Sequence, residues 1–399
     1  MTQAEKTGDT LTQEDRLLAA IEAKDGDVMA ELVADMPGPD FAEFIRDQPL
    51  ELGQKLLSFL PIPQRARAFG YFREDDQIEL AEHMDQATLV QLFNHMNSDE
   101  RADLFNLLSD ELKAQVMRRL ARNEREDLRL LSSYGPGTAG SIMSSDYVAL
   151  PAKSTVAQAF EIIRATAPSA ETIYDIYCID HMGRLLGTIS LRKLMLSRST
   201  MRLEKIMNTE IVSALADDLQ ENVANQIARY DLMALPIIDH GARLVGIVTY
   251  DDAMDVAEQE ATEDIHRGAS VQPMEQGIGS ASLFALYKSR IVWLVLLVFG
   301  NIFSGAGIAH FEDTIASQVA LVFFLPLLIG SGGNAGAQAA TLMVRGLATE
   351  EIRMGDWFRL IGREVLIASA LGLTMAIAIA PIGAIRGGEA IALIVGLTM

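Results

Sequence analysis

Three long uncharged runs near the C-terminus constrain the fold of this chain most strongly. Residues 291–309, 314–344 and 365–385 contain no Asp, Glu, Lys or Arg over 19, 31 and 21 positions. A helix needs about 20 mostly apolar residues to cross the hydrocarbon core of a membrane. The sequence therefore predicts an α-helical transmembrane domain with three complete spans, which we place at residues 288–399.

The second run is longer than a core of about 30 Å requires, because a helix rises about 1.5 Å per residue. We expect it to tilt or to break, either at Pro326 or in the glycine-rich stretch 330–336. Residues 390–399 are apolar again, and we interpret them as the start of a fourth span in a sequence truncated at its C-terminus. A short interfacial tail is the alternative.

Basic residues predict the orientation of these spans. Lys288 and Arg290 flank the first run, and Arg345, Arg353, Arg359 and Arg363 lie between the second and the third. The loop near residues 310–313 contains no Lys or Arg. Because Lys and Arg collect on the cytoplasmic side, the N-terminal part of the chain is predicted to be cytoplasmic.

Charge excludes some classes of function. The formal net charge is −21, and residues 281–399 hold seven acidic and seven basic side chains, so the whole excess lies in residues 1–280. So acidic a surface repels nucleic acid and attracts cations. The lone cysteine, Cys178, lies in an apolar run and is expected to be a buried thiol. Without a phosphate-binding glycine loop, a nucleophile constellation or a Cys/His cluster, the chain is not expected to be an enzyme.

An internal repeat organises residues 59–120. Apolar side chains stand at 12-residue intervals, and a second apolar register follows nine residues after the first. Short helices with one apolar face each cannot bury that face alone, so we expect them to stack into an all-α solenoid. The first register is Leu60, Phe72, Met84, Met96, Leu108 and Leu120, and the second is Phe69, Ala81, Phe93, Phe105 and Met117.

A second repeat follows the first. Residues 179–195 recur as 238–254, with seven of 17 positions identical at an offset of 59, and each copy is typical of strand, turn, strand and helix. This unit resembles a tandem pair of CBS domains, an α/β regulatory module that commonly binds adenosine nucleotides. The resemblance implies Thr249 and Asp252 as nucleotide-binding residues in the second copy. The first copy has Ser190 but Lys193 in place of the carboxylate, so ATP binding is left open.

The order of these parts resembles the MgtE family of magnesium transporters. Two stretches sharpen the resemblance, residues 260–266 (EATEDIH) and 326–341 (PLLIGSGGNAGAQAAT). The expected domains are a helical N domain (1–135), two CBS copies (136–199 and 200–262), a connecting or plug helix (263–287) and the transmembrane domain (288–399).

The resemblance implies a homodimer in the inner or plasma membrane that conducts Mg²⁺ and closes when cytosolic Mg²⁺ is high. Carboxylates suit this task, because Mg²⁺ prefers oxygen ligands. Asp99 and Asp103 are four residues apart, so a helix would present both on one face. The sequence leaves open whether Mn²⁺ or Co²⁺ is also carried. The candidate Mg²⁺-sensing residues are Asp99, Asp103, Asp231, Asp252, Asp255, Glu260, Glu263 and Asp264.

Polar residues in the second span form a candidate pore lining. Asn334, Gln338 and Thr341 share one helical face, and Gly332 and Gly333 directly precede Asn334. Close helix packing through the GxxxG spacing of residues 332–336 is the competing interpretation.

The family's pore-coordinating acidic residue lies on a fifth span, and nothing in this sequence corresponds to it. We therefore expect the chain as given not to conduct. A second hypothesis is a non-conducting, membrane-anchored Mg²⁺ or nucleotide sensor that acts through partner proteins.

Overall fold

The computed structural model describes residues 12–46, 48–268, 282–348 and 357–399. The chain divides into two compact units, Met1–Ala257 and Glu258–Met399, which are treated separately below.

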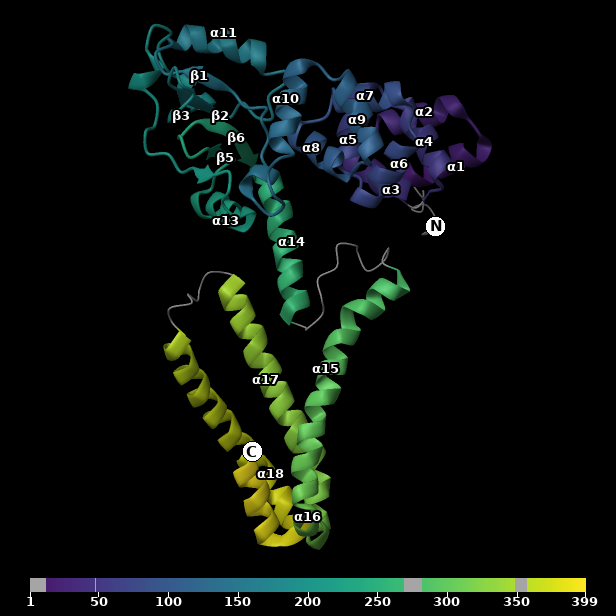
Figure 1. Cartoon of the computed structure of the whole chain (residues 1–399), viewed down its shortest axis with the longest axis vertical. Coiled ribbons are helices and arrows are strands. Elements are labelled where there is room, and N and C mark those ends of the chain that lie inside the picture. The colour runs from purple at the N-terminus through teal and green to yellow at the C-terminus, as the bar shows by residue number, and fades with distance from the viewer. Residues whose placement is uncertain (1–11, 47, 269–281, 349–356) are drawn as a thin grey trace, which may run out of the picture. The chain divides into compact units, whose positions relative to one another are not determined.

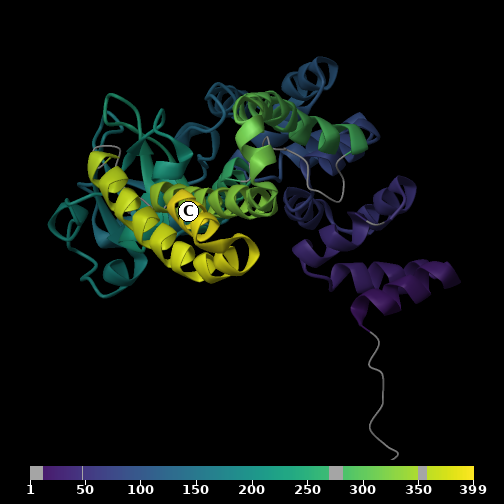
Figure 2. The same ribbon diagram turned by 90° about the horizontal axis from the view of Figure 1, so that it is seen from below.

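The described part of the first unit begins with a helical solenoid. Helices α4 to α10 start at 12-residue intervals, so the predicted repeat is confirmed and covers more of the chain than residues 59–120. The helices follow one another away from the CBS sheets, from blue α10 to purple α1 (Figures 1 and 2). The ten helices are α1 (Gln13–Ala23), α2 (Gly26–Ala34), α3 (Gly38–Arg46), α4 (Leu50–Phe59), α5 (Ile62–Gly70), α6 (Glu74–Glu82), α7 (Gln86–Phe93), α8 (Ser98–Leu107), α9 (Asp110–Arg119) and α10 (Arg122–Leu131).

Both apolar registers of the repeat build the core of the solenoid. Phe69 and Phe93, from the second register, are fully buried inside their helices. Residues of the first register, such as Leu60 and Leu108, are buried at the positions where helices α4 and α8 end. Each repeat therefore buries one side chain within its helix and one at its turn, which ties successive helices together.

The two CBS copies each form a three-stranded sheet. In each sheet the central strand pairs in parallel with the first strand and antiparallel with the third. The first copy contains η1 (Ala139–Ser141), β1 (Ala149–Pro151), α11 (Val156–Thr166), β2 (Asp175–Ile179), β3 (Leu185–Ser190) and α12 (Leu191–Met195). The second contains η2 (Leu203–Lys205), β4 (Ala214–Leu215), α13 (Gln220–Tyr230), β5 (Ala234–Ile238), β6 (Leu244–Thr249) and the start of α14 (Tyr250–Gly268). The predicted order of strand, turn, strand and helix is confirmed in both.

The two copies are joined by reciprocal backbone hydrogen bonds. Leu185 N donates to the carbonyl of Ala242 over 3.0 Å, and Leu244 N donates to that of Gly183 over 3.0 Å. Tyr177 and other apolar side chains of both sheets are buried between them. Since each bond of one copy has a counterpart in the other, the pair behaves as one body that can hold side chains at fixed positions.

The second unit contains helices long and apolar enough to cross a membrane. Three such helices are found in its described residues, as predicted. Besides residues 258–268 of α14, its described elements are α15 (Leu283–His310), α16 (Glu312–Ser317), η3 (Val319–Phe324), α17 (Leu325–Ala348) and α18 (Trp357–Thr398).

The long second run breaks, but only at one of the two expected places. The irregular turn η3 ends at Phe324, and Pro326 lies in the first turn of α17, where its missing N–H leaves no hydrogen bond unmade. The expected break in the glycine-rich stretch is wrong, because α17 runs through it as a continuous helix. A glycine costs a helix only about 1 kcal/mol, which is less than unsatisfied backbone groups would cost in lipid.

Residues 389–398 fold back as the start of a further helical segment. Gly388 has a φ of 83°, which an L side chain rarely adopts, and the chain reverses there. A Cβ at Gly383 would lie 2.8 Å from Ala392 Cα, and one at Gly372 would lie 2.8 Å from the carbonyl of Met399. The last residues therefore run back along the preceding part of α18.

Part of the predicted plug helix lies outside the described residues. Helix α14 extends to Gly268, and α15 begins at Leu283. Residues 269–281 of the predicted segment 263–287 are not described.

Substituting Phe93 tests the solenoid core. Phe93→Ala removes a fully buried ring, so we expect a loss of about 3–5 kcal/mol in unfolding free energy. Urea unfolding of the detergent-solubilised chain, followed by circular dichroism, measures it. Leu18→Ala, at a side chain that is 42% exposed, should cost far less, and equal losses would contradict the stacking described here.

Candidate cation site

The start of helix α8 is docked on the first CBS copy through a buried hydrogen-bonded seam. Ser98 N donates to Asp146 Oδ2 over 3.1 Å, and Ser145 N donates to Ser98 Oγ over 2.8 Å. The hydroxyls of Ser98 and Ser144 lie 2.9 Å apart, and both residues are fully buried. Ser144 also exchanges backbone hydrogen bonds with Ile247 of β6. The seam therefore connects the solenoid to both CBS copies.

Glu171 extends the seam from a loop of the first CBS copy. Asn97 Nδ2 donates to Glu171 Oε1 over 3.1 Å, and Ser144 Oγ donates to Glu171 Oε2 over 3.4 Å. These two hydrogen bonds hold the Glu171 carboxylate beside the first turn of α8.

Five carboxyl groups meet at this seam, and we call them the carboxylate cluster. Three come from α8, one from the loop of the first CBS copy and one from the first turn of α14. Asp99 interacts electrostatically with three of the others, and Asp252 interacts with every member on α8. The members are Asp99, Glu100, Asp103, Glu171 and Asp252.

Burial and mutual repulsion disfavour the ionised form of every member. Burial first, and then the charges of Asp252, Glu171 and Glu100, raise the pKa of Asp99 well above its ordinary value. Burial and neighbouring carboxylates raise the pKa of Glu100 and Glu171 to about 7. The pKa of Asp103 shifts in the same direction, through loss of hydration and the charges of Glu74 and Asp252, although the residue stays exposed. Burial raises the pKa of Asp252 to about 6. Hydrogen bonds from Thr249 favour the ionised carboxylate and so keep this rise smaller. In the metal-free fold these carboxyl groups therefore ionise only at a cost, because no cation or set of donors in the fold compensates their charge.

Asp99 carries an unsatisfied acceptor at the centre of the cluster. The residue is 9% exposed, and its Oδ1 is buried without a hydrogen-bond partner. Such an atom calls for a proton, a water molecule or a cation. Among the described residues, no group of three or more His, Cys, Asp or Glu side chains stands close enough to hold a metal ion directly. Any ion here would therefore keep part of its water shell, which is the usual state of Mg²⁺ in proteins.

The structure brings together only some of the predicted metal residues. Asp99, Asp103 and Asp252 belong to the cluster, and Asp255 lies one turn beyond Asp252 on α14, close enough to raise its pKa. Asp231 is exposed, in the left-handed conformation that ends α13, and it is not a member of the cluster. Glu260, Glu263 and Asp264 lie further along α14, in the second unit.

Two members of the cluster were not predicted from the sequence. Glu100 lies between the two predicted aspartates on α8. It is not four residues from either of them, so the spacing that places two side chains on one helical face did not point to it. Glu171 lies in the loop after α11, more than 70 residues from Asp99 and about 80 from Asp252. No local pattern links it to either.

The predicted nucleotide-binding residues interact with each other. Thr249 Oγ1 donates to Asp252 Oδ2 over 2.6 Å and also contacts Asp251. Thr249 N donates to Asp252 Oδ2 over 3.4 Å as well, so the Asp252 carboxylate caps the start of α14. At the corresponding end of the first copy, Ser190 caps α12 through Lys193 N. A cavity of about 690 Å³ lies beside this second cap, lined by residues that include Tyr174, Ser190, Arg192 and Met233.

The candidate pore residues share one exposed face of α17. The side chains of Asn334 and Gln338 are exposed, and Thr341 Oγ1 donates to the carbonyl of Ala337 over 2.9 Å. Gly332 and Gly333 lie on the same helix with open space where a Cβ would stand.

Comparison with known families matches four segments of the chain. Residues 36–137 match the MgtE intracellular N domain, residues 139–199 and 203–258 match CBS domains, and residues 325–399 match a divalent cation transporter domain. The matches follow the order expected for the resemblance.

Individual relatives agree with these matches. The chain is 41% identical over 251 residues to the magnesium transporter MgtE of Thermus thermophilus, which covers 63% of this chain and 56% of that protein. It is 36% identical over 269 residues to the MgtE of Bacillus subtilis, covering 67% of this chain and 59% of that protein. The chain thus spans just over half the length of the curated relatives it matches.

Two solved structures resemble the first unit. One is the soluble part of a magnesium transporter, with a TM-score of 0.58 at 30% identity, covering 62% of this chain and 98% of that one. The other is the cytosolic domain of the Mg²⁺ channel MgtE in complex with ATP, with a TM-score of 0.59 at 30% identity, covering 61% of this chain and 99% of that one. With the solenoid, the CBS pair and the apolar helices in this order, the chain belongs to the MgtE family of magnesium transporters.

Proposed function

We propose that this chain is a subunit of a Mg²⁺ channel or transporter whose first unit senses Mg²⁺ and closes the conducting path when Mg²⁺ is high. The observation that carries the proposal is the carboxylate cluster, with the buried, unpartnered Oδ1 of Asp99 at its centre. The names of the relatives, magnesium transporters from two bacteria, support the identity of the ion.

The sensing step follows from electrostatics. At neutral pH the cluster opposes the docking of α8 on the CBS pair, because its carboxyl groups must either take up protons or stand ionised side by side with little water around them. A hydrated Mg²⁺ between the carboxylates removes that penalty. The docked arrangement is therefore the Mg²⁺-bound, closed one, and loss of the ion loosens the seam at Ser98.

Several weak sites are needed for an effective gate. A site that binds only in the closed state contributes about 1.4 kcal/mol when Mg²⁺ is at ten times its dissociation constant. Moving an equilibrium from 1:99 to 99:1 requires about 5.5 kcal/mol. We propose Asp255, Glu260, Glu263 and Asp264 along α14 as ligands of further sites. Asp231, exposed and outside the cluster, is the weakest of the predicted ligands.

The second unit would supply the conducting path. We propose that the face of α17 with Asn334, Gln338 and Thr341 lines it, and that a second copy of the chain completes it. Large apolar side chains of the first unit, including Leu196 at 80% and Met195 at 67% exposure, favour contact with such a copy. The alternative function is a non-conducting sensor that acts through partner proteins.

ATP is proposed as a second ligand of the first unit. The relative whose structure contains ATP supports it. In this chain the cavity beside Ser190 and Arg192 is the proposed place, with the adenine against the apolar side chains. Thr249 and Asp252, the residues predicted from the sequence, would serve a nucleotide only after breaking their own hydrogen bonds.

The double variant Asp99→Asn, Asp252→Asn tests the sensor. In metal-free buffer we expect it to melt at a higher temperature than the wild type, because two carboxyl groups that the folded protein ionises only at a cost are gone. Added Mg²⁺ should then raise its melting temperature far less than that of the wild type. Differential scanning calorimetry of the solubilised chain measures both effects.

Asp231→Asn is the matched control, because it removes a carboxylate outside the cluster and Asn tolerates the left-handed backbone. It should leave the response to Mg²⁺ unchanged. An undiminished Mg²⁺ response in the double variant would refute the sensor.

Stability should also depend on pH in a defined direction. The folded cluster binds protons more tightly than the unfolded chain, since its pKa values are raised to about 6 or 7. The metal-free protein should therefore gain stability as the pH falls from 8 toward 5. Saturating Mg²⁺ should flatten the gain in melting temperature, and so should Asp99→Asn. If the melting temperature fell between pH 8 and pH 5 by the same amount in the metal-free wild type and in Asp99→Asn, the cluster would not be the source of the pH dependence.

Transport distinguishes the two candidate functions. Expression of the gene that encodes this chain in a bacterial strain that requires high Mg²⁺ should restore growth and Mg²⁺ uptake at low Mg²⁺. Asn334→Leu should reduce uptake, while Ser369→Ala on α18, whose hydroxyl donates to its own helix, should not. Mg²⁺ binding without uptake by the wild type would favour the non-conducting sensor.

A further inference from the structure

The carboxylate of Glu100 lies against a glycine of the solenoid. A Cβ built on Gly70 would stand 2.9 Å from Glu100 Oε2 and 2.5 Å from Glu100 Cδ, and it would also overlap Oε1. Non-bonded carbon atoms make their best contacts at about 3.5–4.0 Å, so no side chain fits here beside the carboxylate. Gly70 therefore leaves the space that the end of the Glu100 side chain fills.

The backbone does not require a glycine at this position. Gly70 is the last residue of α5, and its φ lies outside the left-handed region in which glycine is favoured. Glycine also makes a helix less stable than alanine does. What the fold uses at Gly70 is therefore the empty space and not the freedom of the backbone.

Glu100 is also held from its own helix. It is the third residue of α8, and its carboxylate accepts a hydrogen bond from the backbone N–H of Asn97, which precedes the helix. A glutamate at this position commonly reaches back in this way. Asn97 Nδ2 in turn donates to Glu171 Oε1 over 3.1 Å. The conformation of Glu100 is therefore tied to the first turn of α8 and, through Asn97, to a second member of the carboxylate cluster.

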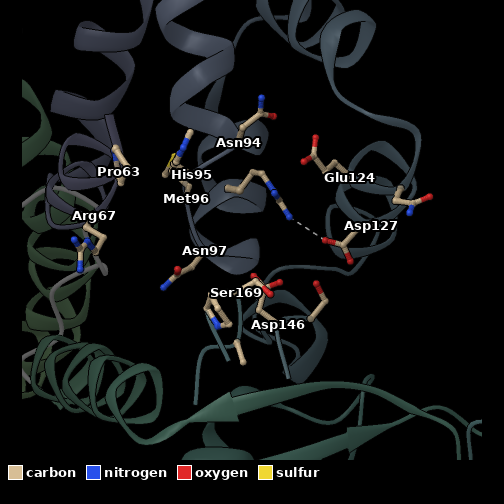
Figure 3. Close-up of a pocket in the computed structure, with 15 residues that line it drawn as sticks. Pro63, Arg67, Asn94, His95, Met96, Asn97, Glu124, Asp127, Asp146 and Ser169 are labelled. Carbon is tan, nitrogen blue, oxygen red and sulfur yellow. Dashed lines mark hydrogen bonds and ion pairs between the residues drawn. The ribbon is translucent and has the colours of Figure 1, made fainter. Parts of the chain in front are cut away.

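Helix α8 is fixed on another face, so it cannot easily move aside. Ser98 N donates to Asp146 Oδ2 over 3.1 Å. The buried Arg101 donates from Nη2 to Asp127 Oδ2 over 3.1 Å, the contact drawn as a dashed line in Figure 3. A polar cavity of about 690 Å³ lies beside these contacts (Figure 3). Breaking buried polar contacts costs more than turning a flexible side chain, so a larger residue at position 70 would displace the Glu100 carboxylate and leave the helix in place.

We propose that Gly70 is a positioning residue of the cation site, which keeps the Glu100 carboxylate in the cluster by having no side chain of its own. The inference rests on the proposed Mg²⁺ sensor. Glu100 interacts electrostatically with Asp103, Glu171 and Asp252. An ion that keeps part of its water shell depends on acceptors placed around that shell, so displacing one carboxylate weakens its binding.

Gly70→Ala tests the proposal through the Mg²⁺ response of the solubilised chain, measured by differential scanning calorimetry over a series of Mg²⁺ concentrations. Loss of an outer partner of a metal typically weakens binding about tenfold or more. The Mg²⁺ concentration needed for a given rise in melting temperature should therefore increase severalfold, since the proposed sites along α14 are unchanged. In metal-free buffer the variant should melt close to the wild type, because only the end of a flexible side chain has to move.

Glu100→Ala supplies the background that separates positioning from a general disturbance of α5. Without the Glu100 carboxylate, Gly70→Ala has nothing to displace, so the double variant should respond to Mg²⁺ as Glu100→Ala alone does. In metal-free buffer, Gly70→Ala should raise the melting temperature of Glu100→Ala, because alanine favours the helix and the space is now empty.

Gly26→Ala is the matched control. Gly26 also lies at the end of a solenoid helix, α2, and a Cβ there would meet nothing within 4 Å. It should leave the Mg²⁺ response unchanged. The proposal is overturned if Gly70→Ala responds to Mg²⁺ as the wild type does, or if it weakens the response equally with and without Glu100. A wild type that does not respond to Mg²⁺ would overturn the sensor as well, which distinguishes the two failures.

Discussion

Repulsion among five clustered carboxyl groups, with the buried Asp99 among them, is the interaction on which the proposed function of this protein turns. The hydrogen bonds of Ser98 and Ser144 hold α8 against the CBS pair, and by doing so they force Asp99 toward Asp252 and Glu171. Attraction in the seam and repulsion in the cluster act on the same few residues. Such a balance is what a switch needs, because a small ligand that cancels the repulsion changes which arrangement is the more stable.

Helix α8 contributes acidic side chains to one site and a basic side chain to a neighbouring one. Asp99 and Asp103 belong to the carboxylate cluster, whereas Arg101, between them in sequence, lines the polar cavity. Any movement of this helix changes both surroundings at once.

The sequence predicted much of the architecture because repetition leaves a periodic trace. The 12-residue spacing predicted the solenoid, and helices α4 to α10 keep that spacing. The repeat of residues 179–195 as 238–254 predicted both sheets and their order of strands. The uncharged runs predicted the apolar helices. The expected break among the glycines was wrong, because helix continuity in an apolar run outweighs the weak helix propensity of glycine.

What the sequence alone determined was local: the periods of its apolar residues, the length of its uncharged runs, and the pairing of Asp99 with Asp103 on one face of a helix. These depend on neighbours a few positions apart, where geometry is set by the backbone. The tertiary structure decided which carboxylates meet, because Glu171 and Asp252 reach α8 only when the CBS pair docks on the solenoid. It also decided that Asp231 stays outside and that Arg101 keeps a free donor. Burial and contacts between distant residues set the pKa of a carboxyl group. Neither leaves a repeating pattern in the sequence from which it could be predicted.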